Sequence, residues 1–525
     1  SQWLAATPRT YYIYDTQTQT KTEIITDLFG NVYVSPKANY IVYFDRLKAQ
    51  WFSYDIAKKQ TKNLTQNIKV SFVDEENDMP TEARQYGLGY FDETDTKVYI
   101  YDRYDIWQFD LTGAAAPKII TNQFGRKNKL RFRIPKLHNE FKTVGTEILV
   151  SSFNETNKAS GLYKIENANT VANPVFVIEE AVKGYTNIQK AEDASYYLLT
   201  KENALESANL YITQNLTQQT QITELNKQQA NYNWHTVELV KWKTNKRNKA
   251  EGLLYKPENL DPNKKYPMLV YFYEKNNEEL HRYEAPAPTP SRLNIPYFTS
   301  NDYIVFVPDI AYKDGHPGKS AEEYINSGVK HLVKQNKWIN ADKIGIQGQS
   351  WGGYQVTHLI TRTNMYAAAW AGAPVSNMTS AYGGIRWGTG MTRQFQYEKT
   401  QSRIGKTLWE DLDLYIQNSP IFYFDKVNTP VAVMHNDNDG AVPWYQGIEM
   451  YTALRRLNKP VWMLNYNNDE HNLMKRQNRK DIQIRQQQFF DYYLKDAKAP
   501  IWMTKGVPAT SKGLEWGFEL TDDKV

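Results

Sequence analysis

The sequence contains no cysteine, which removes several kinds of site at once. A disulfide scaffold, a thiolate zinc site, an iron–sulfur cluster and a cysteine nucleophile all depend on that residue. Long apolar runs are missing too, since none reaches the ~18 residues that a membrane span needs. The first residues show no basic-then-apolar signal pattern. Basic residues outnumber acidic ones only slightly, 63 against 58, so charge gives no reason to expect a nucleic-acid partner.

Aromatic residues, by contrast, are abundant. The chain carries 14 Trp, 38 Tyr and 20 Phe, which supply enough apolar area to exclude intrinsic disorder. Its 525 residues predict about two to four domains, at about 100–200 residues each. The pattern of the sequence changes once, and the change divides the chain into residues 1–230 and 231–525.

Residues 1–230 are predicted to form an all-β domain. Short runs rich in Tyr, Ile and Val, such as 11–14 and 98–101, alternate with polar turns. Five segments share an aromatic or apolar strand ending at a polar turn, and they start 40, 55, 56 and 48 residues apart: 12–15, 52–55, 107–110, 163–166 and 211–214. A period of about 40–50 residues indicates propeller blades, and the alternative is a large β-sandwich. Five blades are few, so we expect a partial propeller.

Residues 231–525 alternate between strand and helix signals, after a stretch rich in Gln, Asn and Thr at 213–233. The predicted strands are 267–273, 303–307, 343–346, 366–371, 430–434 and 461–466, and the predicted helices are 321–335, 355–363, 444–457 and 482–495. This alternation predicts an α/β domain, doubly wound, with a mostly parallel sheet covered by helices on both faces.

The strongest local motif is Gly-Gln-Ser-Trp-Gly-Gly at 348–353, between a predicted strand and a predicted helix. This is the nucleophile-elbow pattern, in which a tight turn lifts the serine hydroxyl above the edge of the sheet. Glycines flank the serine because a Cβ there would collide with the neighbouring strand and helix. Ser350 is therefore the predicted nucleophile, and the alternative is a glycine-rich turn without chemistry.

A serine needs a base and an orienting acid, which follow it in the order acid, then histidine. Asp437 and Asp439 both lie in the loop after the strand at 430–434, and His471 lies in the loop after the strand at 461–466. His471 is the predicted base, with an aspartate fixing its tautomer. The other histidines are predicted to be structural: His138, His235, His281, His316, His331, His358 and His435.

The acidic loop also resembles a calcium loop at first sight. An EF-hand would need an acid in place of His435 and a glutamate in place of Gln446, and neither is present. The sequence predicts no metal and no cofactor.

These three motifs together resemble the prolyl oligopeptidase family of serine peptidases, in particular its dipeptidyl peptidase IV and acylaminoacyl peptidase branch. The resemblance covers about residues 234–503. It implies an α/β-hydrolase domain beside a β-propeller of seven or eight blades. It also selects Asp439 as the acid, and it assigns the oxyanion hole to the hydroxyl of Tyr273 and the amide of Trp351.

The same resemblance points to residues that would bind substrate. In the dipeptidyl peptidase branch, aromatic residues wall the proline pocket where this chain has Met378, Thr379, Ser380 and Ala381, with Trp387 beyond them. Strict preference for proline is therefore not predicted.

Charged residues suggest two further contacts. Arg386 and Arg393 would hold a substrate carboxylate, or would brace a surface loop. The resemblance to dipeptidyl peptidases also implies an acidic clamp for a substrate amine, which Asp74, Glu75 and Glu76 would form unless they are a solvated turn.

The leading interpretation is a serine peptidase that acts on short peptides admitted by the propeller. The alternatives are an esterase or other acyl hydrolase, and a catalytically silent structural or binding subunit. The expected partners are peptide substrates, with a homo-oligomer or a separate N-terminal portion of one precursor as further candidates. The sequence start at Ser1, close to a blade strand, motivates the idea of a processed fragment. The absence of cysteine is compatible with a periplasmic, cell-surface or secreted location.

Overall fold

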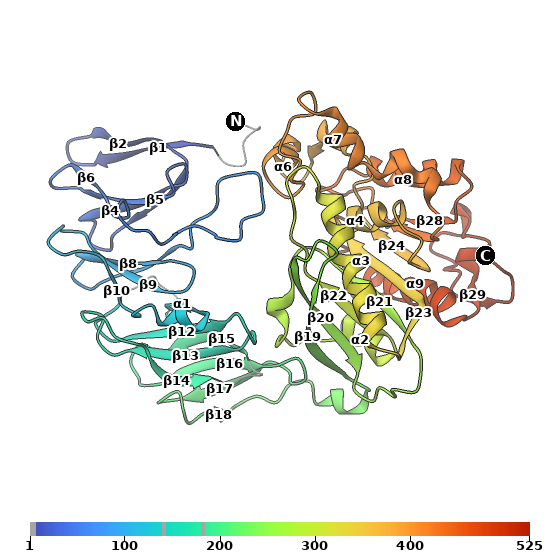
Figure 1. Cartoon of the computed structure of the whole chain (residues 1–525), viewed down its shortest axis with the longest axis horizontal. Helices are drawn as coiled ribbons and strands as arrows, with labels where there is room; N and C mark the ends of the chain where they lie inside the picture. Colours follow the sequence, from blue (N-terminus) through green and yellow to red (C-terminus); the bar gives the residue numbers. More distant parts are fainter. Residues whose placement is uncertain (1–6, 139–142, 180–183) are drawn as a thin grey trace. The chain divides into compact units, whose positions relative to one another are not determined.

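The computed structural model describes residues 7–138, 143–179 and 184–525. Within them the chain divides into two compact units (Figure 1). The first unit runs to Lys227 and also includes His281–Tyr283, whereas the second comprises Gln228–Leu280 and Glu284–Val525. Ser1, on which the idea of a processed fragment was based, lies outside the described residues.

The first unit consists of antiparallel sheets whose strands follow one another in chain order (Figure 1). A hairpin of β1 (Arg9–Asp15) and β2 (Thr20–Leu28) comes first. Four sheets of four strands follow: β3 (Gly30–Val34), β4 (Tyr40–Asp45), β5 (Gln50–Asp55) and β6 (Gln60–Asn63); β7 (Leu88–Phe91), β8 (Lys97–Tyr101), β9 (Ile106–Asp110) and β10 (Lys118–Ile119); β11 (Leu130–Arg133), β12 (Ile148–Asn154), β13 (Ser160–Ile165) and β14 (Val175–Glu179); β15 (Gly184–Lys190), β16 (Tyr197–Glu202), β17 (Asn209–Thr213) and β18 (Thr220–Gln221). A short helix, α1 (Phe124–Asn128), precedes β11.

The repeat read from the sequence marks one strand position in this unit. Four of the five segments fall on β5, β9, β13 and β17, the third strand of each four-stranded sheet. The remaining segment, 12–15, falls on β1. The third strand is recognisable because it carries aromatic residues, such as the buried Trp107 and Phe109 of β9, and then ends at a polar turn. Asp110 caps its turn by accepting the amide of Thr112 at 2.8 Å.

The second unit contains an eight-stranded sheet in the order β19-β20-β22-β21-β23-β24-β27-β28. Its strands are β19 (His235–Lys243), β20 (Lys249–Pro257), β21 (Tyr266–Tyr271), β22 (Ile304–Pro308), β23 (Ile339–Gln349), β24 (Ala368–Gly372), β27 (Val431–Met434) and β28 (Val461–Leu464). β19 and β20 pair antiparallel, β20 also pairs antiparallel with β22, and every other pair is parallel. The predicted α/β domain with a mostly parallel sheet is confirmed, and it begins with an antiparallel pair that the prediction lacked.

Helices cover both faces of this sheet because the strand residues alternate between two cores. Met268 and Val270 face the core formed with α3 (Pro317–Gln335), α4 (Trp351–Ile360) and α8 (Tyr445–Arg456). Leu269, between them, faces the core formed with α2 (Ile295–Ser300) and α9 (Arg476–Lys495). Strands that are buried on both faces read as continuous apolar runs, which is why the sequence revealed them.

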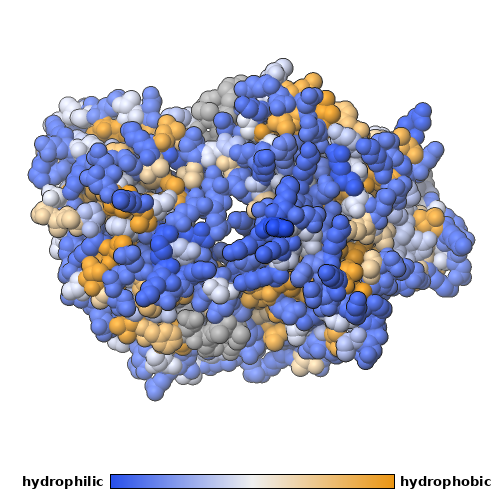
Figure 2. Space-filling model, in the orientation of Figure 1, coloured by the Kyte–Doolittle hydropathy of each residue, from blue (hydrophilic) through white to orange (hydrophobic). Residues whose placement is uncertain are grey.

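Several short elements complete the second unit. Between β24 and β27 lie α5 (Met378–Tyr382), β25 (Ile385–Arg386), β26 (Met391–Thr392), α6 (Gln394–Lys399) and α7 (Leu412–Gln417), and at the end lie β29 (Ala499–Pro500), α10 (Ile501–Thr504) and β30 (Leu520–Thr521). No helix of the described residues is long and apolar enough to cross a bilayer. On the face shown in Figure 2, apolar residues form scattered patches among polar ones.

The chain reverses direction within the sheet beside β21. From β21 it moves to β22 on one side, and then β23 joins the other side of β21. Tyr271 at the end of β21 pairs with Gln347 near the end of β23. The carboxyl ends of these two strands therefore lie side by side at the switch point, where α/β sheets commonly place their sites.

Candidate active site

Ser350 stands at the turn between β23 and α4. It is the residue before the first helical position, and its backbone has φ 61° and ψ −114°. This conformation is rare for a residue with a side chain and costs on the order of 1–3 kcal/mol. The amide of Ser350 donates to the carbonyl of Gly372 at the end of β24 (2.8 Å), which ties the turn to the neighbouring strand. The hydroxyl is thereby presented at the carboxyl edge of the sheet.

The glycines around Ser350 are required by close backbone approaches. A Cβ on Gly348 would lie 2.4 Å from the carbonyl carbon of Gly352, and a Cβ on Gly353 would lie 2.3 Å from the carbonyl oxygen of Gly372. On Gly352 it would lie 2.5 Å from the carbonyl oxygen of Phe272. Any other residue at these positions would push the helix away from the sheet, so the tight turn depends on all three.

Asp439 is the acid that the geometry selects from the loop after β27. One carboxylate oxygen accepts the amides of Ala441 and Val442, both at 2.8 Å. The other oxygen accepts Nδ1–H of His471 at 2.7 Å. Asp437 instead accepts the side chain of Asn467 and the amide of Asn468. Asp439 alone therefore orients the predicted base.

The surroundings keep the Asp439 carboxylate ionised. Its side chain is fully buried, and burial by itself would raise its pKa. Hydrogen bonds from His435 and His471 outweigh that effect and hold the pKa of Asp439 well below its ordinary value. An ionised carboxylate fixes the tautomer of His471, whose Nε2 is then free of a proton and able to act as a base.

The loop that carries His471 is anchored next to the nucleophile. Gln349, the residue before Ser350, donates from its side chain to the backbone carbonyl of His471 at 2.8 Å. Asn436, near Asp439, donates likewise to the carbonyl of Glu470. These two amide contacts bring together the ends of β23, β27 and β28, so that acid, base and nucleophile occupy one edge of the sheet.

Tyr273 and the Trp351 amide adjoin the same turn. Tyr273 lies two residues beyond β21, and its ring is 3.8 Å from where a Cβ on Gly352 would stand. Its hydroxyl accepts the side-chain amide of Gln401 at 2.8 Å, and its carbonyl accepts the side-chain amide of Gln355 at 2.7 Å. Trp351 starts α4, so its amide is one of the free donors of the first turn. Both predicted oxyanion donors are thus near Ser350.

The other predicted substrate residues differ widely in exposure. Met378 is fully buried, and Arg393 is 0% exposed. Trp387 is 70% exposed at the tip of the β25–β26 hairpin, and Arg386 is half-buried beside it. Met378 therefore packs in the core and does not line an open pocket, whereas the hairpin carries the accessible groups.

The acidic cluster at residues 74–76 is engaged by arginines of its own unit. Glu75 pairs with Arg126 at 2.9 Å, and Glu76 pairs with Arg103. Asp74 accepts the amide of Glu76 at 3.0 Å. A free amine would have to compete with these guanidinium groups for the two glutamates.

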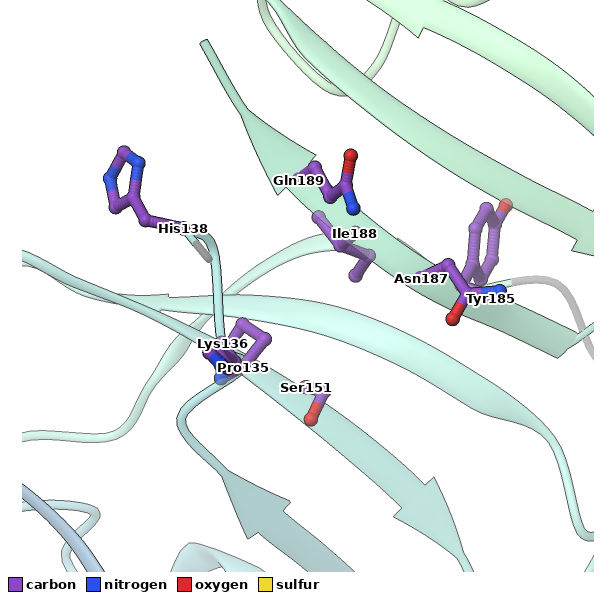
Figure 3. Close-up of a pocket in the computed structure, with 8 residues that line it drawn as sticks. All are labelled: Pro135, Lys136, His138, Ser151, Tyr185, Asn187, Ile188 and Gln189. Carbon is purple, nitrogen blue, oxygen red and sulfur yellow. The ribbon is translucent and has the colours of Figure 1, made fainter. Parts of the chain in front are cut away.

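A separate pocket of about 430 Å³ lies in the first unit, between the segment after β11 and strand β15 (Figure 3). Its lining includes Lys136, His138, Ser151 and Tyr185. The Ser151 hydroxyl donates to the carbonyl of Arg133 at 3.1 Å, and the lining contains no carboxylate to activate it. Within the residues that the structure describes, this pocket has no arrangement for nucleophilic chemistry.

Comparison with protein families identifies the region that carries this site. Residues 290–497 match the model of the prolyl oligopeptidase family, and the match includes Ser350, Asp439 and His471. This region is therefore similar to the prolyl oligopeptidase family. The predicted resemblance is confirmed.

Curated peptidases match part of the chain. The acylamino-acid-releasing enzyme of Rattus norvegicus is 31% identical over 161 residues, which are 30% of this chain and 21% of that protein. The dipeptidyl-peptidase 5 of Porphyromonas endodontalis is 25% identical over 245 residues, or 42% of this chain and 32% of that protein. The chain thus spans less than two thirds of the length of these relatives.

Solved structures share the fold over most of the chain. A puromycin-hydrolyzing peptidase of Mycobacterium tuberculosis has a TM-score of 0.65 and 15% identity, covering 91% of this chain and 72% of its own. The acylaminoacyl peptidase of Pyrococcus horikoshii has a TM-score of 0.60 and 16% identity, covering 96% of this chain and 76% of its own. These likenesses support an α/β-hydrolase domain with an N-terminal β domain.

The structure brings to this site three side chains to which the sequence assigned no part in it. His435 Nε2 lies 3.3 Å from the Asp439 oxygen that accepts His471, and it also contacts the carbonyl of Val442 at 3.1 Å. Gln349 anchors the His471 loop, and Gln401 contacts the Tyr273 hydroxyl. Only His435 left a signal in the sequence, because it precedes Asp439 by four residues in the same loop.

Proposed function

We propose that the chain is a serine peptidase that hydrolyses short peptides through an acyl-enzyme at Ser350. The observation that carries the proposal is the hydrogen bond of 2.7 Å between buried Asp439 and partly exposed His471, whose loop is tied to the residue before a strained serine. The match to a family of peptidases favours peptides over simple esters as substrates.

The proposed reaction follows from the roles of these groups. His471 Nε2 takes the proton of the Ser350 hydroxyl as its oxygen attacks the scissile carbonyl carbon. The Trp351 amide and the Tyr273 hydroxyl stabilise the negative charge on the carbonyl oxygen, and each such donor contributes about 3–4 kcal/mol. His471 then gives the proton to the leaving amine, and a water repeats the sequence on the acyl-enzyme.

The experiment that tests this function separates an activated serine from peptide turnover. The purified protein is labelled with a fluorophosphonate probe and is also incubated with a mixed peptide library followed by mass spectrometry. We expect labelling and cleavage in the wild type, and neither in Ser350→Ala or His471→Ala. Labelling with ester turnover but no peptide cleavage would point to an acyl hydrolase. A folded protein that is not labelled at all would contradict the proposal.

We also propose that the sheets of the first unit are blades of a β-propeller that filters substrates by size. The support is the run of four-stranded antiparallel sheets in chain order, together with the fold likeness to family members. A series of peptides of increasing length, set against an unfolded protein such as casein, tests the filter. Equal kcat/KM values for short peptides and casein would refute it.

A location in the periplasm, at the cell surface or outside the cell is proposed on the absence of cysteine alone. Fractionation of the source cells, with the activity assayed in each fraction, tests this location. Activity confined to the cytosol would reject it.

A further inference from the structure

The β25–β26 hairpin rests on the loop that carries the catalytic acid. The amide of Gly388 donates to the carbonyl of Gly440 at 2.9 Å. Arg393, just beyond β26, donates from its guanidinium to the carbonyl of Ala441. Because Gly440 and Ala441 directly follow Asp439, the hairpin is held beside the triad.

A chain of side-chain hydrogen bonds links Arg386 in this hairpin to the predicted oxyanion tyrosine. Arg386 donates to Gln396 at 3.1 Å, and Gln396 donates to Gln401 at 3.3 Å. Gln401 donates in turn to the hydroxyl of Tyr273 at 2.8 Å. Arg386 is therefore two glutamines away from the group that would hold the scissile carbonyl oxygen.

Two positive charges in this place have no carboxylate partner. Among the described residues, no acid lies within ion-pair distance of Arg386 or Arg393, whereas nearby Arg403 pairs with Glu274 at 2.8 Å. Arg393 is completely buried, and its Nε has no hydrogen-bond partner within the described part of the chain. Burial and the charge of Arg393 lower the pKa of Arg386, and they outweigh the more distant Asp439 carboxylate, which by itself would raise it. A buried cation without a counter-ion is unfavourable, so this site would gain from an added anion.

We propose that Arg386, with the charge of Arg393 behind it, binds a carboxylate of the peptide substrate next to the scissile bond. This inference rests on the peptidase function proposed above. Half-buried Arg386 uses one donor on Gln396 within the described residues, which leaves the rest of its planar fork for a bidentate contact with a carboxylate. The carboxylate would be the side chain of Asp or Glu, or the free C-terminus of a short peptide.

Matched substrates distinguish these two sources. Fluorogenic peptides are compared that differ only by Glu or Gln before the scissile bond, and peptides with a free C-terminus are compared with amidated ones. We expect the wild type to prefer one carboxylate-bearing member of a pair by at least about tenfold in kcat/KM. Preference for Glu identifies a side-chain carboxylate, and preference for the free C-terminus identifies a terminal one.

Substitutions of Arg386 test whether this residue causes the preference for a carboxylate-bearing substrate. Arg386→Met is expected to bring the ratio within the preferred pair close to one, and Arg386→Lys to keep part of it. Arg456→Met, which removes an exposed arginine at the end of α8, is the matched control and should keep the wild-type ratio. An active enzyme that discriminates in neither pair, or an Arg386→Met variant with the full preference, would overturn the proposal.

A readout without turnover keeps this test separate from that of the peptidase function. Fluorophosphonate labelling is measured in the presence of N-acetyl-glutamic acid amide or N-acetyl-glutamine amide, and of a short peptide with a free or an amidated C-terminus. We expect the carboxylate-bearing competitor to slow labelling of the wild type more than its neutral partner, and to lose that advantage in Arg386→Met. Equal competition within both pairs would reject the Arg386 site even if no cleavable peptide were found.

Discussion

Aspartates at the ends of strands serve different purposes in the two units. Asp110 in the first unit uses both carboxylate oxygens within its own turn, where they accept hydrogen bonds from the amides of Thr112 and Ala115. Asp439 in the second unit makes the same kind of turn with one oxygen only, and it turns the other toward His471 and His435. A common turn motif thus becomes part of the proposed catalytic site when a second loop brings histidine to the spare oxygen.

The strongest test of this comparison is the same substitution at both aspartates. Asp439→Asn is expected to lower kcat by about 10³–10⁴-fold, because an amide facing His471 favours the wrong tautomer. Asp110→Asn should leave kcat within about twofold and cost less than about 1 kcal/mol of stability. Peptide turnover and urea unfolding measure the two effects. Similar kinetic losses in both variants would show that Asp439 has no special role.

The hydroxyl of Tyr273 provides the next largest expected effect. Tyr273→Phe removes one oxyanion donor and should lower kcat about 10²-fold with little change in KM. Tyr271→Phe, two residues earlier in β21 and packed in the opposite core, is the control and should change kcat by less than about twofold. Steady-state kinetics on one peptide substrate suffice. Equal kcat values for both variants would remove Tyr273 from the oxyanion hole.

Acid stability is expected to separate the two units. Burial lowers the pKa of His358 to about 3 and that of His235 to about 4, and both belong to the second unit. Because the unfolded chain binds these protons first, near pH 6.5, stability falls as the pH drops from 6.5 toward 3. His358→Met should reduce the loss of unfolding free energy between pH 6.5 and 4.5 by about 2–3 kcal/mol. Urea titrations at the two pH values measure it, with limited proteolysis to show which unit opens first. An unchanged loss in the variant would contradict this account.

The smallest effect is expected at His435, the second histidine on Asp439. His435→Asn removes a donor from the Asp439 carboxylate that orients His471, so kcat should fall by about threefold. His435→Gln, which can place an amide near the lost Nε2, should restore most of the activity. Steady-state kinetics on one peptide substrate measure both variants. An equal loss in both variants would mean that His435 acts only through packing.

The sequence predicted best those features that depend on neighbouring residues. The nucleophile elbow is a strand, a turn and a helix in a row, so the glycines and Ser350 were recognisable without the rest of the fold. The strands that are buried on both faces were visible as apolar runs. α9 begins at Arg476, before the predicted residue 482, because its first turns are charged and carry no apolar period.

Features that join distant segments could not be read from the sequence. Gln401 meets Tyr273 across 128 positions, and Gln349 meets His471 across 122. Gln401 belongs to no motif, and the elbow motif that contains Gln349 gives no sign of the distant carbonyl that its side chain contacts. The β25–β26 hairpin pairs strands of two residues each, which are too short to show any period, so Arg386 could be named but not placed.

The separate hydrogen-bond ladders of the first unit have a consequence for how such a chain can change through evolution. Each four-stranded sheet closes its own ladder between consecutive strands, and no ladder between named strands joins one sheet to the next. A duplication or deletion of about 50 residues, in register with the third-strand repeat, would add or remove one whole sheet and leave every other ladder intact. The β unit can therefore vary in length by modules while the sheet edge that holds Ser350, Asp439 and His471 in the other unit keeps its own hydrogen bonds.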